Sequence, residues 1–445
     1  MTQQLTAQED YDVKARRISG THAEKLEQID AAIQELLDIK MLECASDRPG
    51  VQFLAVPRPR SHAFAMFVTI LAMLILLVLL LGVRPAHAQS AADGPPPWHV
   101  GGTLAVSFLN SNDDPANHLF RTRGTTPTVD EWSVDMAMIT AKKASAAASR
   151  WGVELTAQTG GDTDTFGFSP TAPNIAGAEW LRRLGPTNVS YLAPLGRGLT
   201  IQGGIFSSLI GYDSLYAKDN FAYTRPWGAD FTPYFMLGAN VAYPFTDKFT
   251  LTGFVVNSYF HLSRPNSVPN VGAQVARALT PQLSLKETGM FGSHQADAGL
   301  SHWRTLSDTT LERKWKRATV AGEVQLATET VAETGDRASW VSAQVPIHFV
   351  VGGPWTVTFR PEAARDPSGR YTSVRQTVYA MTSTLEFRGH LHSGDAVVRA
   401  EYRFDNSTGA QGGFFSGPDN VLVPRQHLLI GAFILAFDHA VPVSK

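Results

Sequence analysis

Cysteine is almost absent from this sequence, because the chain of 445 residues holds a single one, Cys44. A mature chain that begins after Cys44, as argued below, therefore has no disulfide, no thiol chemistry and no thiolate metal site. An excess of charge of one sign is also missing, since 38 Lys and Arg residues stand against 40 Asp and Glu residues. This balance gives no indication of a nucleic-acid partner.

Long hydrophobic runs are scarce too, and a single segment, 63–83, lacks charged residues over a length that fits a membrane-spanning helix. Two arginines precede it and the small residues Ala86 and Ala88 follow it, which is the pattern of a secretory signal peptide. We therefore predict a signal peptide over 61–88 that is cut between Ala88 and Gln89. The apolar core is long for a signal peptide, which keeps open an inner-membrane anchor that carries a periplasmic β-domain.

Residues 1–60 form a separate N-terminal extension. Between residues 21 and 42, Leu26, Ile29, Ile33 and Leu36 recur at spacings of three and four, which predicts an amphipathic helix. Either this extension is a short regulatory or coiled-coil arm, or the start codon is assigned too early. Residues 89–97 contain three consecutive prolines and are expected to form a stiff linker.

From Trp98 onward, apolar and polar residues alternate with period two, which is typical of strands with one apolar face. The first such segment places the following residues on one face: Trp98, Val100, Leu104, Val106 and Phe108. The same analysis of a second segment places Trp132, Val134, Met136 and Met138 on the apolar face. Alternation alone also fits a soluble β-sandwich, so the choice of fold depends on how the segments are joined.

The connections between these segments are short and long in turn. Short ones such as 194–198 and 279–281 alternate with long polar ones such as 110–128 and 406–424. Tight turns at one rim and long loops at the other are the signature of a transmembrane barrel. We predict an all-β fold, a single closed antiparallel transmembrane β-barrel of about 16 strands (roughly 14 to 18) over 98–437, with 438–445 as a C-terminal tail.

A barrel of this size leaves a lumen that side chains cannot fill, so inward charged residues are candidate pore-lining groups. Arg399, Glu401, Arg403 and Asp405 alternate in sign along one predicted strand, and Glu323 lies on the polar face of another. These charges either set a local field that screens solutes or simply solvate the inner wall.

The long connection 208–232 is rich in aromatic residues and carries the charged residues Asp213, Lys218, Asp219 and Arg225. Exposed aromatic rings gain nothing from water, so a loop of this composition is expected to be packed. Our hypothesis is that it folds into or over the pore mouth and narrows it, and ordinary packing on the surface is the alternative.

Catalytic signatures are absent: the sequence has no G-x-S-x-G elbow, no H-E-x-x-H motif, no Walker loop and no G-x-G-x-x-G motif after a strand. His390 and His392 form a close pair, but a metal site needs three or four ligands. We therefore predict no catalytic residues, no metal and no cofactor.

Several short motifs resemble those of the OmpL-like β-barrel porins of Gram-negative bacteria, over about 98–437. The residues that carry the resemblance are Gly211-Tyr212-Asp213, Asn220, Tyr223-Thr224-Arg225, Val256-Asn257-Ser258, Arg403, Asp405 and Ser407. The resemblance implies an outer-membrane porin that lets small hydrophilic solutes or ions diffuse passively. Separately, we expect the outer-membrane assembly machinery to insert the barrel, and the formation of a homo-oligomer stays open. The alternative of another class is a barrel with a blocked lumen that acts as a hydrolase or adhesin.

Overall fold

The computed structural model describes residues 95–165, 181–260, 262–295, 300–391 and 394–441. The predicted N-terminal extension, signal peptide and most of the proline-rich linker lie outside these residues. Within the described residues, no helix is long and apolar enough to cross a membrane.

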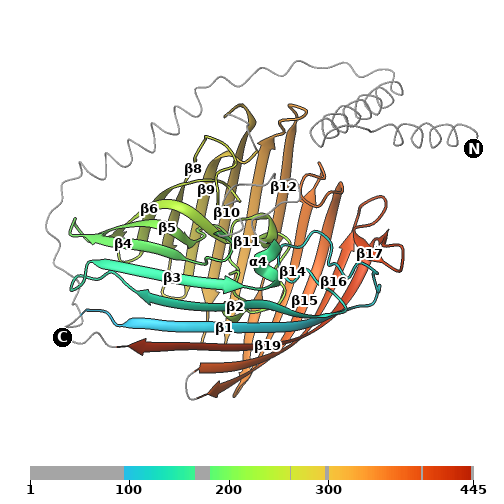
Figure 1. The fold of residues 1–445 in the computed structure, drawn as a ribbon, viewed down its shortest axis with the longest axis horizontal. Helices are drawn as coiled ribbons and strands as arrows, with labels where there is room; N and C mark the ends of the chain where they lie inside the picture. The colour runs from blue at the N-terminus through green and yellow to red at the C-terminus, as the bar shows by residue number, and fades with distance from the viewer. Residues whose placement is uncertain (1–94, 166–180, 261, 296–299, 392–393, 442–445) are drawn as a thin grey trace, which may run out of the picture. The chain divides into compact units, whose positions relative to one another are not determined.

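The chain from Trp98 onward is built almost entirely of antiparallel strands (Figure 1). In chain order they are β1 (Trp98–Ser111), β2 (Trp132–Lys143), β3 (Trp151–Thr159), β4 (Thr187–Ala193), β5 (Leu199–Ser207), β6 (Phe235–Thr246), β7 (Phe249–Val256), β8 (Asn270–Ala278), β9 (Leu283–Ser293), β10 (Trp303–Lys314), β11 (Ala318–Thr330), β12 (Arg337–Gln344), β13 (Ile347–Gly352), β14 (Trp355–Asp366), β15 (Gln376–Leu391), β16 (Gly394–Ser407), β17 (Phe414–Ser416), β18 (Val421–Val423) and β19 (Arg425–Val441). Short helical turns are α4 (Gly161–Thr165), η1 (Ala217–Asp219), η2 (Ala229–Phe231) and η3 (Leu300–His302).

The sheet closes on itself, because β1 pairs with β2 on one side and with β19 on the other. β12 and β13 both pair with β11 and β14 and together make one barrel strand, interrupted at Pro346, which has no backbone N–H for the ladder. The result is a closed antiparallel barrel of 16 strands, which confirms the predicted fold class.

Connection lengths alternate around the barrel. Residues 247–248, 315–317 and 353–354 link strands at the rim that we call the short-turn rim, and 112–131, 208–234 and 408–424 link strands at the opposite, long-loop rim. Both ends of the barrel lie at the short-turn rim, where Trp98 pairs with Val441. β19 thus runs four residues beyond Phe437, into the segment expected to be a tail.

The barrel wall is apolar outside and polar inside, as a lipid-facing wall requires. On β16, Val398 and Tyr402 are 48% and 40% exposed on the outer face, whereas the alternating Arg399 and Arg403 are buried inside. Aromatic pairs such as Trp355 and Phe387, with ring centroids 5.0 Å apart, lie near the short-turn ends of their strands.

β2 departs from the predicted alternation. The register with β1 shifts between Ala105 and Val106, where β2 carries an extra residue. Such a bulge exchanges the two faces of the strand that follows it. Trp132 is 76% exposed on the outer face as predicted, but Met136 is buried inside and Ile139 is 56% exposed. The prediction that Met136 shares a face with Trp132 was therefore wrong.

The main hydrophobic core lies inside the barrel. It joins inward residues of the wall, such as Leu109 and Val397, to Tyr223, Trp227 and Tyr234. The last three belong to residues 208–234, the connection between β5 and β6, which we call the inner loop.

Candidate pore constriction

The inner loop turns into the barrel and is buried there. Tyr223, Arg225 and Trp227, in its middle, are 0%, 0% and 1% exposed. Two 3-10 turns, η1 and η2, shape it. A loop that packed on the outside of the rim would not reach inward residues on the opposite wall, as this one does.

Asn220 fixes the local fold of the inner loop. Its side-chain oxygen accepts a hydrogen bond from the backbone N–H of Ser214 at 2.7 Å, and its Nδ2 donates to the Ser214 carbonyl at 2.8 Å. Both bonds close the segment around η1. Next to it, Phe221 stacks on His348 of β13, with ring centroids 4.2 Å apart and planes 10° apart. Short polar and planar side chains thus hold the loop in one conformation.

Three wall arginines hold the inner loop by its backbone carbonyls. Arg399 donates from Nη1 to Ala217 at 2.8 Å and from Nη2 to Asn220 at 2.6 Å. Arg360 on β14 donates to the Thr224 carbonyl at 2.7 Å, and Arg403 on β16 donates to the carbonyl of the next residue, Arg225, at 3.1 Å. Carbonyl groups that are shielded from water need such donors, because an unpaired buried carbonyl lowers the free energy of unfolding.

Wall carboxylates hold the N–H groups of the same loop. Glu401 accepts from the backbone N–H of Tyr223 at 2.6 Å and of Thr224 at 3.0 Å. Glu362 accepts from the Trp227 N–H at 2.5 Å, and Asp405 accepts from the Trp227 indole Nε1 at 2.8 Å. β14 and β16 therefore present alternating donors and acceptors that match the loop backbone.

Three further wall strands, β10, β11 and β12, hold the start of the loop. Glu323 on β11 accepts from the Tyr212 N–H at 2.9 Å, and Glu312 on β10 accepts from the Tyr212 hydroxyl at 2.7 Å. Gln344 donates to Asp213 at 2.7 Å. Burial raises the pKa of the Asp213 carboxyl above its ordinary value, and Arg360 partly offsets this shift. The inner loop thus contacts β10, β11 and β12 at its start and β14 and β16 in its middle.

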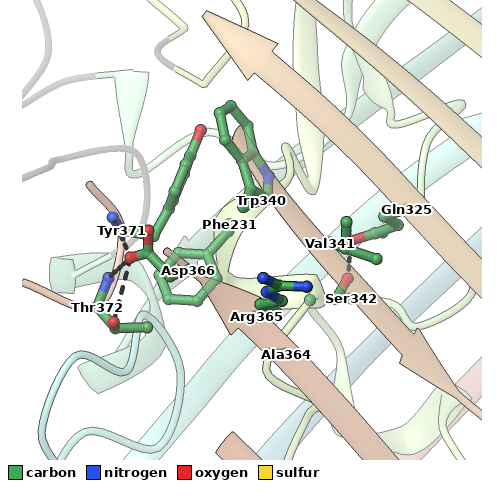
Figure 2. Close-up of a pocket in the computed structure, with 11 residues that line it drawn as sticks. Phe231, Gln325, Trp340, Val341, Ser342, Ala364, Arg365, Asp366, Tyr371 and Thr372 are labelled. Carbon is green, nitrogen blue, oxygen red and sulfur yellow. Dashed lines mark hydrogen bonds between the residues drawn. The ribbon is translucent and has the colours of Figure 1, made fainter. Parts of the chain in front are cut away.

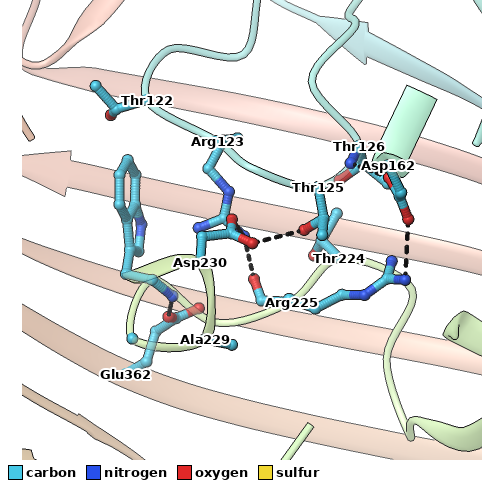
Figure 3. A network of polar contacts seen from close by, with 12 residues as sticks. Thr122, Arg123, Thr125, Thr126, Asp162, Thr224, Arg225, Ala229, Asp230 and Glu362 are labelled. Carbon is cyan, nitrogen blue, oxygen red and sulfur yellow. Dashed lines mark hydrogen bonds and ion pairs between the residues drawn. The ribbon is translucent and has the colours of Figure 1, made fainter. Parts of the chain in front are cut away.

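A network of ion pairs ties the inner loop to two other long loops (Figure 3). Arg225 pairs with Asp162 of α4 at 3.0 Å, and Arg123 of the β1–β2 connection pairs with Asp230 at 2.9 Å. Arg123 also donates to the Arg225 carbonyl, and its guanidinium lies 5.0 Å from the Trp227 ring centroid. All four charged side chains are buried, so each depends on its partner.

An aromatic cluster anchors the end of the inner loop on the long-loop side (Figure 2). The rings of Phe231 and Tyr371 lie 5.0 Å apart, and those of Trp340 and Tyr371 lie 3.9 Å apart. Arg304 lies 5.2 Å from the Trp340 ring and pairs with Glu329 at 2.5 Å. The cavity between these groups measures about 10 Å³, room for about one water molecule.

The structure brings most of the predicted site residues together at the contact between wall and loop. Arg399, Glu401, Arg403 and Asp405 do line the inner face of β16, but they are 1%, 3%, 0% and 0% exposed. The inner loop covers these four side chains, and their role as pore-lining or constriction residues stays a prediction. Asp213, Arg225 and Glu323 lie in the same contact, and their role in a constriction stays a prediction.

Lys218 and Asp219 differ from the other candidates, because they keep solvent exposure. Their side chains are 27% and 47% exposed and pair with each other at 2.8 Å. They lie in η1, on the part of the inner loop that contacts the wall through Arg399.

Sequence reasoning missed Arg123, Asp162, Arg360 and Glu362. Arg360 and Glu362 stand in the same alternating pattern as the charged row of β16 and could have been found by applying that pattern to 355–366. Arg123 and Asp162 lie in separate long loops, and nothing in their local sequence shows that they meet the inner loop. Among the described residues, no group of three or more His, Cys, Asp or Glu residues is placed to hold a metal.

The Asp162 carboxyl should make stability depend on pH. Burial raises its pKa to about 7, although Arg225 opposes this shift. An unfolded chain has this pKa near 4, so between about pH 4 and 7 the folded protein binds the additional proton. We expect the free energy of unfolding to fall as pH rises through this range, and D162N to remove that part of the slope.

Urea midpoints of the refolded barrel in detergent, measured from pH 4 to pH 8, test this expectation. D164N is the matched control, because Asp164 lies in the same helix and its side chain is 53% exposed. Equal slopes for the wild type and D162N would contradict the assignment.

Comparison with solved structures finds several outer-membrane proteins at low sequence identity. OmpT of Vibrio cholerae is 10% identical over 79% of this chain and 100% of its own, with a TM-score of 0.48. The outer membrane channel DcaP of Acinetobacter baumannii is 10% identical over 80% of this chain and 100% of its own, with a TM-score of 0.49. An anion-selective porin from Comamonas acidovorans is 11% identical over 77% and 99%, with a TM-score of 0.47.

Identities this low say nothing about a shared solute. No curated protein matches the sequence. A family model described as "Putative beta-barrel porin-2, OmpL-like" matches residues 97–437, and the chain therefore belongs to this family of outer-membrane β-barrel porins.

Proposed function

We propose that this outer-membrane barrel passes small hydrophilic solutes or ions by passive diffusion, and that the inner loop narrows its channel. The observation that carries the proposal is the inner loop, held inside the lumen by Arg399 and Glu401 of β16 and by Glu323 of β11. A 16-stranded barrel without such a loop encloses a wide aqueous channel. A fixed loop reduces that width without closing the barrel itself.

The remaining passage is proposed to run past the exposed side of η1. Lys218 and Asp219 lie there, and Lys286 and Lys314 are exposed on the inward faces of β9 and β10 toward the short-turn rim. In a narrow passage, hydrated charged side chains replace part of the bulk water that a polar solute loses when it enters. No catalytic set is proposed, and the expected homo-oligomer and assembly machinery remain predictions.

Single-channel recording in planar bilayers tests the proposal. We expect stepwise conductance without added substrate, and a reversal potential in a KCl gradient that reports the ion preference. A correctly refolded barrel that shows no steps at any voltage would overturn the porin function. That outcome would favour the blocked-lumen alternative, a barrel-borne hydrolase or adhesin.

A further inference from the structure

Arginines gather on the outer face of one part of the long-loop rim. Arg337 begins β12, Arg365 lies next to the end of β14, Arg375 directly precedes β15 and Arg425 begins β19. All four are exposed. Since β12, β14, β15, β16 and β19 are consecutive neighbours in the barrel, these residues form a row along adjacent strands, which we call the arginine row.

The strand register places Arg365, Arg375 and Arg425 within four residues of β15, and Arg337 lies further toward the loops, because Val341 of its strand pairs with Arg365. Arg365 pairs with Thr377 of β15, and Arg425 pairs with Asn406 of β16, which pairs in turn with Tyr379. The two heights thus differ by two residues of β15. Adjacent strands are about 4.8 Å apart, so neighbouring guanidinium groups can reach one ligand.

The arginine row faces away from the lumen. Arg365 stands between Ala364 and Asp366, which are buried inside, and Arg425 precedes the buried Gln426. Below the row, toward the middle of the membrane, the same outer face is apolar: Phe359, Met381 and Leu429 are 39%, 37% and 60% exposed. A row of cations therefore sits directly above a lipid-facing wall.

The carboxylates of these strands do not neutralise the row. Asp366 points inward and accepts from the Thr372 N–H at 2.8 Å, and Asp405 is taken by Arg403 at 2.8 Å. Among the residues that the structure describes, none of the four arginines forms an ion pair. Arg337 lies over the Trp303 ring at 3.9 Å, and Arg425 donates to Asn406 at 3.2 Å. The exposed Asp336 adjoins Arg337 at the edge of the row.

We infer that the arginine row binds the phosphate groups of an acylated, phosphorylated glycolipid in the outer leaflet. Long loops face the outside of an outer membrane, so the row lies at the headgroup level of that leaflet. A guanidinium donates two parallel hydrogen bonds to a phosphate, and uncompensated arginines at a membrane surface attract anionic lipids. The apolar wall below offers a surface for the acyl chains. This site goes beyond the channel function, because it requires no open pore.

Lipid binding to the full-length barrel in detergent micelles tests the inference, with native mass spectrometry as the readout. The probes are diphosphorylated lipid A and the same lipid with its phosphates removed. The variant is R365Q/R375Q/R425Q, which leaves Arg337 on Trp303. The control is R277Q/R313Q/R317Q, since these three arginines are equally exposed but lie at the short-turn rim.

We expect the wild type and the control to bind the diphosphorylated lipid alike, and the variant to bind it at least about tenfold more weakly. Removal of the phosphates should abolish the difference, and millimolar inorganic phosphate should not displace the lipid. Unchanged binding by the variant, or equal loss in the control, would overturn the site. Displacement of the lipid by free phosphate would also overturn the site, because the row would then bind a soluble anion. Loss of a dimer in the variant would overturn it as well, because the row would then contact a second copy of the chain.

Discussion

Replacing residues 214–230 of the inner loop with a short Gly/Ser linker is expected to raise single-channel conductance on the order of fivefold. The physical reason is geometric. The wall of a 16-stranded barrel leaves an aqueous lumen, and here Tyr223, Trp227 and their neighbours fill part of it. The linker keeps the β5–β6 connection but removes the segment whose backbone N–H groups, at Tyr223 and Trp227, bond to Glu401 and Glu362.

The matched control for this deletion shortens the exposed connection 331–336, which lies at the same rim but outside the lumen. Its conductance should equal that of the wild type. Far-ultraviolet circular dichroism and heat-dependent electrophoretic mobility show whether each barrel has folded. If a folded deletion variant conducts like the wild type, the inner loop does not form the constriction.

Much of the barrel could be predicted from the sequence because two of its signals are local. Alternation along a strand, as in β16, can be recognised within a short stretch of sequence. The same is true of the length of a connection, such as the two-residue turn after Gly352. The bulge on β2 could not be predicted in this way. The extra residue opposite Ala105 is set by pairing with β1, and the sequence of β2 alternates on both sides of it.

The candidate site was predictable only in part, for a related reason. The composition of the inner loop indicated packing, and the charged row of β16 indicated an inner face. That these two segments cover each other is a contact between residues far apart in sequence, such as Tyr223 and Glu401. Asp162 and Arg123 join it through loops whose conformation depends on the inner loop itself.

Among single substitutions in the wall, replacing Arg403 is expected to lower the free energy of unfolding most. It pairs with Asp405 at 2.8 Å and Glu362 at 3.0 Å, and its side chain is fully buried. R403M would leave Asp405 inside the barrel without its cation, and would leave Glu362 with Arg360 alone, at 3.5 Å. Breaking a buried ion pair in this way costs about 3–5 kcal/mol, so the urea midpoint of the refolded barrel should fall markedly.

The double variant R403M/D405N separates the effect of charge from the effect of packing. D405N removes the buried negative charge that R403M leaves without its cation. The Asn side chain can still accept the hydrogen bond from the Trp227 indole. We expect it to be more stable than R403M alone. R313M, at an exposed arginine near the short-turn rim, should change stability by less than about 1 kcal/mol. A double variant as unstable as R403M would show that lost packing, rather than unpaired charge, explains the effect, and a wild-type midpoint for R403M would show that the wall does not depend on this pair.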